Sequence, residues 1–441
     1  MKNVNKYVIV ILETIIISLF TNMSKFIITG GKKLAGEIAV GGAKNNAQIM
    51  IPVALLSTET MIIKNVPQID GVEKSLELMR SLGAKIKEGN HKLEINTAGL
   101  NKTELDKKIA NKFRTSVMFV GPILARLGKV KFPHPGGCVI GAAGRPIDLF
   151  LEGFEALGAK VKISSRNYII TAKKLKGCDF FFTIMSVTGT QSMIMTACLA
   201  EGTTILRNCA MEPEVVALAD YLNAQGAKIS GAGTPTIIIE GVKKLSAGVC
   251  EIIPDRIEAG SFALMAAATN SEIKITNCNP EHIHYLLTIF NKIGVNYEKG
   301  DNWILMKKSG KIKPYNLKTH EYPGFSTDLQ SPYVVLMTQA QGTSLIQETI
   351  YDRRLLWTDM LSQLGANIVM CDPHRITVNG PTKLYARKLI SPDIRAGIAL
   401  VIAALIAEGT TEIDNIYQID RGYEKLDLRL RKLGADIKRI E

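Results

Sequence analysis

The chain has 441 residues, of which 46% are hydrophobic and 22% charged, and its formal net charge is +13. This length suggests two or three domains, and this composition excludes an intrinsically disordered chain. The basic residues are scattered without a run of five, which favours anionic small molecules over nucleic acid as ligands.

Residues 1–22 differ from the rest of the chain. Residues 8–20 are apolar except for Glu13, and two lysines precede them. This stretch is too short to span a bilayer and resembles a weak signal peptide. Met23, followed by Ser-Lys, is typical of a natural protein start. We expect residues 1–22 to be an extension upstream of that start, with a membrane anchor or an ordinary helix as the alternatives.

A short phrase built around a glycine recurs six times along the chain. Its first copy reads Leu82-Gly83-Ala84-Lys85-Ile86. The glycines of the six copies are Gly83, Gly158, Gly226, Gly294, Gly365 and Gly434. Successive glycines lie between 68 and 75 residues apart. A near-constant period indicates a repeated architecture.

Each copy of the phrase predicts the end of a helix followed by a strand. Residues 72–79 place apolar side chains at three- and four-residue spacing, Gly83 supplies a left-handed helix end, and residues 85–87 favour a strand. A second marker, Ala-Glu-Gly-Thr-Thr at 200–204 and again at 407–411, follows an apolar helix and precedes a strand. We therefore expect each unit to run strand, helix, strand, helix, strand.

The six units predict the fold class, which is α/β. A period near 70 residues is too long for a solenoid, so two similar domains of three units each, with helices packed inside sheets, are expected. Pro254-Asp255-Arg256 lies between the third and fourth units and is the candidate crossover between the domains.

The cysteines bear on the compartment and on metal sites. The chain has seven, widely spaced and without a Cys-x-x-Cys pair. They are Cys138, Cys178, Cys198, Cys209, Cys250, Cys278 and Cys371. An odd number at wide spacing favours a reducing compartment and argues against a disulfide framework or a structural zinc site. We expect most of them to be small apolar core residues.

Eight short motifs, in order along the chain, carry a family resemblance. They are Gly42-Ala43-Lys44-Asn45, Arg114-Thr115-Ser116, Pro135-Gly136-Gly137-Cys138, Arg145-Pro146-Ile147-Asp148-Leu149, Pro254-Asp255-Arg256-Ile257-Glu258, Thr327-Asp328-Leu329-Gln330, Asp393-Ile394-Arg395-Ala396 and Ile419-Asp420-Arg421-Gly422-Tyr423-Glu424. Together they resemble the UDP-N-acetylglucosamine 1-carboxyvinyltransferases, the enolpyruvyl transferases that open peptidoglycan synthesis. The resemblance implies two inside-out α/β domains, residues 44–253 and residues 23–43 plus 254–441, because in that family the N-terminal strand joins the second domain.

The resemblance also implies a reaction. The enolpyruvyl group of phosphoenolpyruvate moves to the 3-hydroxyl of UDP-N-acetylglucosamine by addition and elimination, phosphate is released, and no cofactor or metal is needed. Arginine forks suit the phosphate and carboxylate of phosphoenolpyruvate. Lys44, Arg145 and Arg421 would bind the anion, with Arg395 near its carboxylate. Cys138 is the candidate acid and covalent partner, which an epoxide phosphonate of the fosfomycin class would alkylate, and Asp328 is the candidate base.

A second set of residues is implied for the nucleotide sugar. It consists of Asn45, Arg114, Pro146, Ile147, Asp148, Leu149, Ser186, Val187, Asp328 and Ile350, and Arg354 matches a family arginine near the same cleft. The expected partners are therefore phosphoenolpyruvate and UDP-N-acetylglucosamine in the cytoplasm. We expect no nucleic acid, and no membrane unless residues 1–22 provide an anchor.

Each candidate has a purely structural alternative, and the chain departs from the family at three places. The structural alternatives are a buried thiol for Cys138, a solvated charge for Lys44, a helix cap for Arg421 and a helix N-cap for Asp328. The departures are a Cys138–Arg145 separation two residues longer than usual, Phe150 in place of a common histidine, and Thr188-Gly189 in place of Gly-Ala.

Three other functions are weighed against this one. The sister transferase for shikimate 3-phosphate lacks the loop cysteine and the Arg-Gly-Tyr-Glu ending found here at 421–424. A degenerate paralogue that binds UDP-sugar without turnover is favoured only by the longer loop. An RNA-end cyclase needs a catalytic histidine in a basic C-terminal motif, and the six histidines form no such motif.

Overall fold

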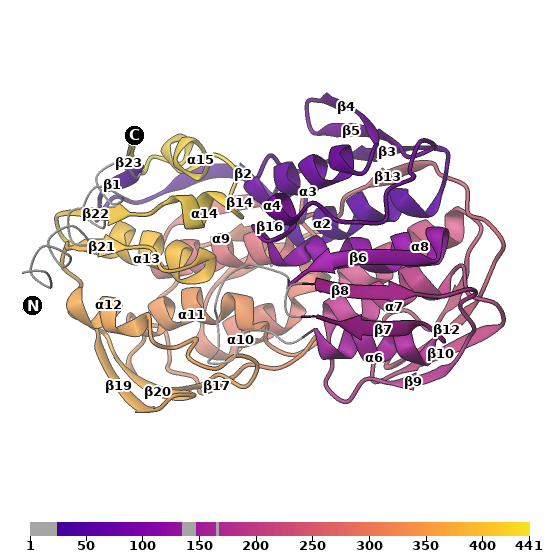
Figure 1. The fold of residues 1–441 in the computed structure, drawn as a ribbon. Helices are drawn as coiled ribbons and strands as arrows, with labels where there is room; N and C mark the ends of the chain where they lie inside the picture. The colour runs from indigo at the N-terminus through magenta and orange to yellow at the C-terminus, as the bar shows by residue number, and fades with distance from the viewer. Residues whose placement is uncertain (1–23, 135–146, 165–166) are drawn as a thin grey trace, which may run out of the picture.

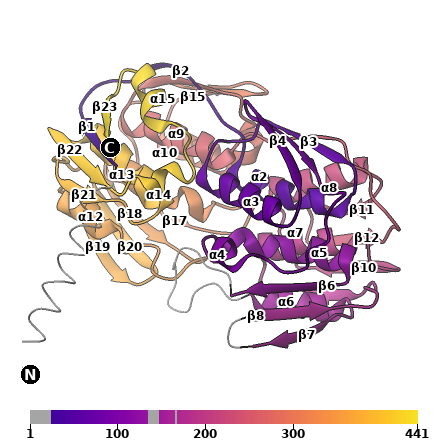
Figure 2. The same ribbon diagram turned by 45° about the horizontal axis from the view of Figure 1, so that its top comes forward.

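Six small sheets are distributed between two lobes that lie side by side (Figures 1 and 2). The computed structural model describes residues 24–134, 147–164 and 167–441. Within these ranges five sheets have four strands and one has three. Buried hydrophobic residues form two separate clusters, one drawn from residues 43–252 and the other from residues 26–40 and 257–437. The prediction of an α/β fold built from six units therefore has its counterpart in six sheets and two cores.

The sheets of the first lobe are built from residues 60–251. Their strands, in spatial order, are β13 (Val249–Glu251), β3 (Thr60–Lys64), β5 (Lys92–Asn96) and β4 (Lys85–Gly89); β6 (Lys129–Pro133), β8 (Asn167–Thr171) and β7 (Lys160–Ile163); and β11 (Lys228–Ser230), β12 (Thr236–Glu240), β10 (Thr203–Arg207) and β9 (Asp179–Phe181). In the last sheet β9 runs parallel to β10, and β12 is antiparallel to both β10 and β11.

The second lobe repeats this arrangement. Its strands, in spatial order, are β21 (Lys388–Ile390), β22 (Thr410–Asp414), β1 (Lys25–Thr29) and β23 (Asp436–Ile440); β15 (Tyr297–Lys299), β16 (Trp303–Met306), β14 (Glu272–Thr276) and β2 (Ala35–Ala39); and β17 (Leu317–Lys318), β18 (Gly342–Gln347), β20 (Arg375–Gly380) and β19 (Asn367–Asp372). The indigo strands β1 and β2 thus lie among elements from the C-terminal half (Figure 1).

The unit contains one strand more than expected. Between β9 and β12 the chain runs strand, helix, strand, helix, and then two strands that pair antiparallel, β11 and β12. The turn into this hairpin is made by the glycine of the repeated phrase. All six of these glycines have positive φ, between 82° and 104°. The predicted left-handed helix end is therefore confirmed, and the predicted single strand after it is corrected to a hairpin.

The helices of the first lobe pack together in its core. In chain order they are α2 (Lys44–Val53), η1 (Ala54–Leu56), α3 (Asp70–Ser81), α4 (Lys107–Ala110), η2 (Arg114–Phe119), α5 (Val120–Leu127), α6 (Asp148–Ala156), α7 (Val187–Ala197) and α8 (Pro213–Ala224). Helix α7 contacts α5, α6 and α8, and α2 contacts α3 and α8. The buried helix α7 thus joins the helices around it into one core.

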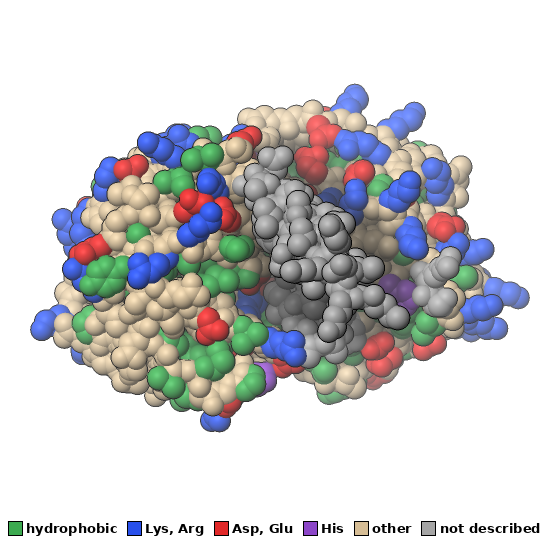
Figure 3. Space-filling view, turned by 60° about the vertical axis from the view of Figure 1, so that its left-hand side comes forward, with side chains coloured by type: hydrophobic (Ala, Val, Ile, Leu, Met, Phe, Trp, Pro, Cys, Tyr) green, Lys and Arg blue, Asp and Glu red, His purple; other side chains and the backbone are tan. Residues whose placement is uncertain are grey.

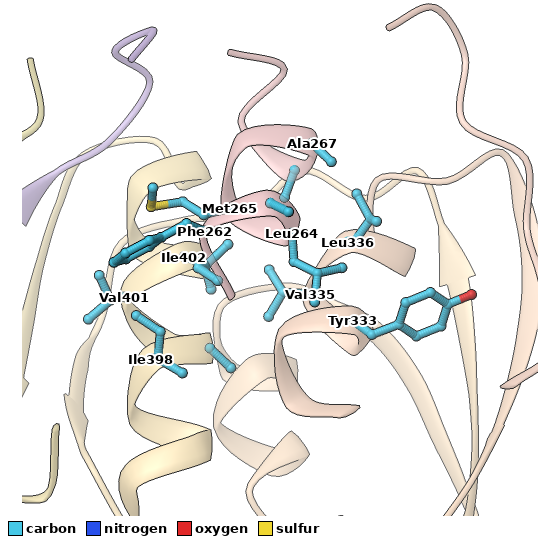
Figure 4. Packing of buried hydrophobic residues seen from close by; sticks show 14 of the residues in the cluster. Phe262, Leu264, Met265, Ala267, Tyr333, Val335, Leu336, Ile398, Val401 and Ile402 are labelled. Atoms are coloured by element: carbon cyan, nitrogen blue, oxygen red, sulfur yellow. The ribbon is translucent and has the colours of Figure 1, made fainter. Parts of the chain in front are cut away.

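The second lobe surrounds three buried helices. Its helices are α9 (Arg256–Ala268), η3 (Pro280–Ile283), α10 (His284–Ile293), η4 (Thr327–Leu329), α11 (Gln330–Met337), α12 (Thr358–Gln363), α13 (Ile394–Ile406), α14 (Tyr417–Asp420) and α15 (Leu426–Lys432). Helices α9, α11 and α13 pack against one another and bury side chains on every face, as Figure 4 shows for Phe262, Val335 and Ile398. Such all-round burial requires helices that are apolar all round.

The two lobes are joined by two neighbouring segments. Gly42 forms an isolated bridge with Pro254, Ala43 N–H donates to Ile253 O at 2.7 Å, and Asp255 N–H donates to Gly41 O at 2.9 Å. One segment leads into α2 and the other into α9. The residues that open these two helices are thereby held side by side where the lobes meet.

The surface carries charges of both signs. Lys and Arg side chains are spread over both lobes with Asp and Glu among them (Figure 3).

Of the cysteines that the structure describes, four are buried, Cys178 is half-buried and Cys371 is exposed, so Cys371 departs from the expectation of a core residue. No helix in the described ranges is long and apolar enough to cross a membrane.

Candidate active site where the lobes meet

Lys44 is held in place by the crossover between the lobes. It is the first residue of α2, and its backbone N–H donates to Asp255 Oδ2 at 3.0 Å. The other carboxylate oxygen of Asp255 accepts the N–H groups of Ile257 and Glu258, at 2.8 and 3.1 Å, and so caps α9. The Asp255 side chain therefore accepts hydrogen bonds from the N-termini of both α2 and α9, and it fixes Lys44 relative to α9.

The surroundings of Lys44 change its acidity. Burial and the nearby positive charges of Arg395 and Arg421 together lower the pKa of its ammonium group to about 8, against an opposing effect of Asp328. Lys44 is half-buried, so the alternative of a freely solvated lysine does not fit its position. Lys44 is close enough to Arg395, Arg421 and Asp328 to interact with them electrostatically, although four different segments supply these residues.

Asp328 lies between two buried arginines. Arg354 Nη2 donates to its Oδ1 at 2.8 Å, and Arg395 Nη2 donates to its Oδ2 at 2.7 Å. The two arginines are only 7% and 6% exposed. Burial alone would raise the pKa of Asp328, but the two guanidinium groups hold it well below its usual range. The carboxylate is therefore ionised at neutral pH, and it accepts charge-assisted hydrogen bonds on both oxygens.

Asp328 does not cap its helix. Ser326 precedes η4, and its Oγ accepts the Asp328 N–H at 3.3 Å. The alternative of an N-cap role for Asp328 is therefore wrong, because Ser326 makes that contact. The Asp328 side chain is left to face the arginines instead.

A buried glutamate supports this arrangement. Glu348 Oε2 accepts the Thr327 hydroxyl at 2.8 Å, and its Oε1 accepts the backbone N–H groups of Ile350 and Tyr351 at 2.8 and 3.1 Å. Thr327 Oγ1 in turn accepts from Arg354 Nη1 at 3.1 Å. Sequence reasoning gave Glu348 no role, and its only signal is an acidic residue directly after strand β18 (Gly342–Gln347).

Arg421 lies at the end of α14. It is the C-cap residue of that helix, and its Nη1 donates to Gln418 Oε1 at 2.9 Å. The helix-cap alternative is thus correct for its backbone, while its side-chain charge acts on Lys44. The residues around it contact the first lobe: the Tyr417 hydroxyl donates to Asp70 Oδ2 at 3.0 Å, and Glu424 Oε2 accepts the Gln68 N–H at 2.8 Å.

The residues expected to bind the nucleotide sugar come from several elements. Asn45 follows Lys44 in α2, Arg114 opens η2, and Ser186 caps α7 by accepting the Gly189 N–H at 3.1 Å on its Oγ. The other described members of the set are Ile147, Asp148, Leu149, Val187 and Ile350. Asp148 opens α6, Val187 opens α7, and Phe150, which replaces a common histidine, is buried. Helix N-termini lie at these places, and the helix dipole there favours a diphosphate.

Three candidate residues lie outside the described part of the chain. They are Cys138, Arg145 and Pro146. The described candidates that the structure brings into mutual contact or electrostatic range are Lys44, Asp328, Arg354, Arg395 and Arg421. This set has four cations and one carboxylate, two of the cations paired with the carboxylate, and it suits the binding of a small molecule with several negative charges. Within the described ranges, no group of three or more His, Cys, Asp or Glu residues could hold a metal ion.

Comparison with protein families and with characterised proteins gives consistent matches. Residues 28–430 match the model of the family described as EPSP synthase (3-phosphoshikimate 1-carboxyvinyltransferase). The chain is 42% identical over 418 residues to UDP-N-acetylglucosamine 1-carboxyvinyltransferase 3 of Caldanaerobacter subterraneus subsp. tengcongensis, covering 95% of this chain and 100% of that protein. It is 41% identical over 419 residues to UDP-N-acetylglucosamine 1-carboxyvinyltransferase of Desulforapulum autotrophicum, with the same two coverages.

Solved structures show the same fold at lower identity. The enolpyruvyl transferase NikO from Streptomyces tendae superposes with a TM-score of 0.85 at 22% identity, covering 95% of this chain and 99% of that one. EPSP synthase from Acinetobacter baumannii gives 0.71 at 17% identity, covering 95% and 100%. At these identities the likeness concerns the fold alone, and it confirms the predicted α/β fold of the enolpyruvyl transferases.

Proposed function

The chain belongs to the UDP-N-acetylglucosamine 1-carboxyvinyltransferase family, and from this premise we propose which of its residues carry each step of the reaction. It is a transferase that moves the enolpyruvyl group of phosphoenolpyruvate onto UDP-N-acetylglucosamine. The observation that carries the proposal is the pairing of Asp328 with Arg354 and Arg395, together with Lys44, which lies within electrostatic range of Asp328, Arg395 and Arg421.

Phosphoenolpyruvate binds to the cations of this set. Lys44 and Arg421, together with Arg145, take the phosphate, and Arg395 takes the carboxylate. A dianion next to Lys44 favours its charged form, so phosphate binding raises the lowered pKa of this lysine and keeps it protonated in the complex. Arg395 has to give up part of its contact with Asp328 when a second carboxylate competes for its amino groups.

This competition connects substrate binding to the base. Asp328 is a weak proton acceptor while Arg354 and Arg395 both donate to it, because its pKa is held far below its usual range. A phosphoenolpyruvate carboxylate that draws Arg395 away removes one of the two charges responsible. The pKa of Asp328 then rises toward its ordinary value, and the carboxylate becomes a better acceptor for the sugar hydroxyl proton.

The reaction then proceeds in two steps. The 3-hydroxyl oxygen of the sugar bonds to C2 of phosphoenolpyruvate while C3 gains a proton and Asp328 takes the hydroxyl proton. The C2–O bond to the phosphate then breaks, C3 loses a proton, and the enol ether forms with release of inorganic phosphate. Cys138 is the proposed donor of the proton to C3, and Lys44 neutralises charge on the phosphate throughout both steps.

The nucleotide sugar binds across the same junction. We assign the uridine and diphosphate to Asn45, Arg114 and the segments 146–149 and 186–187, and we place Ile350 and Arg354 beside the sugar. The N-termini of α6 and α7 support this assignment, because the positive end of a helix dipole favours phosphate oxygens. UDP-N-acetylglucosamine and phosphoenolpyruvate are the only partners that the proposal requires.

We also propose where the domains divide and where the enzyme acts. The division falls at residues 43–44 and 253–254, so that residues 23–43 join 254–441, because each buried core stays on one side of these points except for Ala43, which packs in the first core. We place the enzyme in the cytoplasm, since the six described cysteines are all unpaired, as suits a reducing compartment.

The proposal is tested by comparing the two substrates in alanine variants. We expect Lys44→Ala and Arg421→Ala to weaken phosphoenolpyruvate binding by about tenfold or more, since each removes a charge-assisted hydrogen bond. The affinity for UDP-N-acetylglucosamine should change far less. Arg387→Ala is the matched control, because Arg387 is an exposed arginine that donates only to a neighbouring backbone oxygen. Equal losses of both affinities would show that Lys44 and Arg421 shape the cleft and do not contact phosphate.

A further inference from the structure

A buried polar cluster beside the site has no part in the reaction described above. We call it the interlobe joint. It consists of Glu212 and Glu214 at the start of α8, Arg256 at the start of α9, His282 in η3, and Tyr322. Helix α8 packs in the core of the first lobe, and α9 in the core of the second. The joint therefore places charged side chains of one lobe against those of the other.

Arg256 and Glu214 form the central contact of the joint. Arg256 Nε lies 3.1 Å from Glu214 Oε1 and 3.3 Å from Oε2, and the two side chains are only 10% and 3% exposed. The guanidinium group also lies over the ring of Tyr322, with 5.5 Å between Cζ and the ring centroid. Removing one member of a buried pair leaves an uncompensated charge, which is far costlier than losing a surface pair.

Arg256 has donors to spare, and Glu212 has an acceptor to spare. In the part of the chain that the structure describes, Nη1 and Nη2 of Arg256 make no hydrogen bond, and Glu212 Oε2 is buried without a partner. Burial raises the pKa of Glu212, and the charge of Arg256 opposes that rise. Arg256 thus pairs with Glu214, and its charge also acts on the nearby carboxylate of Glu212, with which it makes no hydrogen bond.

The joint is connected to the site from the second lobe. Arg256 follows Asp255, whose carboxylate accepts the Lys44 N–H, so a shift of Arg256 moves the anchor of Lys44. The charge of Arg256 also acts on Asp328. His282 adjoins the ion pair, and burial lowers the pKa of its ring, which therefore stays neutral near pH 7 and adds no charge to the joint.

The joint is connected to the site from the first lobe as well. Gln191 Nε2 donates to the backbone oxygen of Glu214 at 3.2 Å. Gln191 lies in α7, about one turn from Ser186 and Val187 at the open end of that helix. The Arg256–Glu214 contact consequently lies between the proposed phosphoenolpyruvate residues on one side and the proposed diphosphate residues on the other.

We propose that Arg256 is a positioning residue for the transfer reaction, which holds the two lobes at the separation that both substrates require by pairing with Glu214 across the junction and by balancing the charge of Glu212. The inference rests on the proposed function, because it assumes that one substrate is bound from each side of the joint. Arg256 acts through Lys44, Asp328 and α7, and it does not itself contact the reacting atoms.

The test compares steady-state constants of four variants with those of the unchanged enzyme. Arg256→Gln leaves two buried carboxylates without a counter-charge, and we expect the KM of UDP-N-acetylglucosamine to rise by about tenfold or more, with a smaller fall in kcat. Arg256→Lys keeps the charge and should recover a large part of the loss. Arg256→Gln combined with Glu214→Gln should bind the nucleotide sugar better than Arg256→Gln alone. Arg207→Gln, in an exposed pair with Asp179, is the matched control and should change neither constant.

The outcomes separate this inference from its alternatives. A KM unchanged in Arg256→Gln, a fall in kcat alone, or a double variant no better than the single one would overturn the positioning role. If Arg256→Gln fails to fold, Arg256→Lys and Glu214→Gln give the same comparison with a smaller loss of stability. Unchanged KM values in both variants would equally overturn the positioning role. If the unchanged enzyme forms no product from UDP-N-acetylglucosamine, the proposed function fails. If the unchanged enzyme is active and the variants have the same KM values as it, only the positioning role of Arg256 is refuted.

Discussion

Lys44 shows how much of the site depends on groups that are distant in the sequence. Its pKa is lowered to about 8 by burial and by Arg395 and Arg421, which lie in other repeats. The motif around Lys44 identified the residue, but no local pattern predicts such a shift. The double pairing of Asp328 was likewise not predictable, because its two arginine partners lie 26 and 67 residues away along the chain.

The lowered pKa leads to a prediction on pH. In the free enzyme Lys44 is charged below pH 8 and loses its proton above it, so kcat/KM for phosphoenolpyruvate should fall as the pH rises through about 8. Arginine stays protonated throughout this range, so Lys44→Arg should remove the inflection while any remaining activity persists. Profiles of kcat/KM for each substrate, measured in both enzymes, check this. An inflection near pH 8 that survives in Lys44→Arg would assign it to another group.

At the scale of elements, the repeated phrase predicts helix ends well and strand pairs poorly. The glycine conformation follows directly from the local sequence, and all six copies have it. The strand that directly follows the glycine, such as β4, was predicted, whereas its hairpin partner was missed. The partner β5 has buried positions that alternate, so a period-two pattern was the signal that could have found it.

Helix α14 offers a test of an element that lies between the two lobes. The Tyr417 hydroxyl donates to Asp70 and accepts from Lys74 Nζ at 2.8 Å, and this holds the segment that carries Arg421 against α3. We expect Tyr417→Phe to raise the KM of phosphoenolpyruvate by about two- to tenfold, because each lost bond is worth about 0.5–1.5 kcal/mol. The KM of the nucleotide sugar should stay within twofold, by the same order-of-magnitude reasoning.

The control for this variant is Tyr385→Phe. Tyr385 is also exposed, and the ammonium group of Lys383 lies over its ring, so neither KM should change. If both tyrosine variants raise the KM of phosphoenolpyruvate equally, or neither does, the contact between α14 and α3 has no part in placing Arg421.

At the scale of the whole molecule, the period near 70 residues predicts the number of units. It does not predict which strands from distant parts of the chain pair with one another. Lys25 in β1 pairs with Glu412 in β22, 387 residues away. Such pairing leaves no trace in local composition, and only the family resemblance pointed to it. The contacts of the two linking segments and of the interlobe joint were likewise not predictable from local composition, because the residues that they bring together belong to different repeats.

A truncation tests which part of the chain the fold requires. The second core begins with Phe26 and Ile28 in β1, which are both fully buried. We expect a protein that starts at Met23 to keep its kcat, and to keep its thermal midpoint within about 2 °C, since no described core residue is removed. Thermal denaturation and steady-state assays of both lengths check this. Aggregation of the shorter protein, or loss of a membrane association seen in the longer one, would contradict it.

The central claim concerns the acceptor, and one measurement addresses it directly. Phosphate release from phosphoenolpyruvate is followed with the full-length protein in the presence of either UDP-N-acetylglucosamine or shikimate 3-phosphate, the acceptor of the sister transferase. We predict release with UDP-N-acetylglucosamine, in a one-to-one ratio with the enolpyruvyl ether formed, and none above background with shikimate 3-phosphate. Release with shikimate 3-phosphate, or with neither acceptor, would contradict the account.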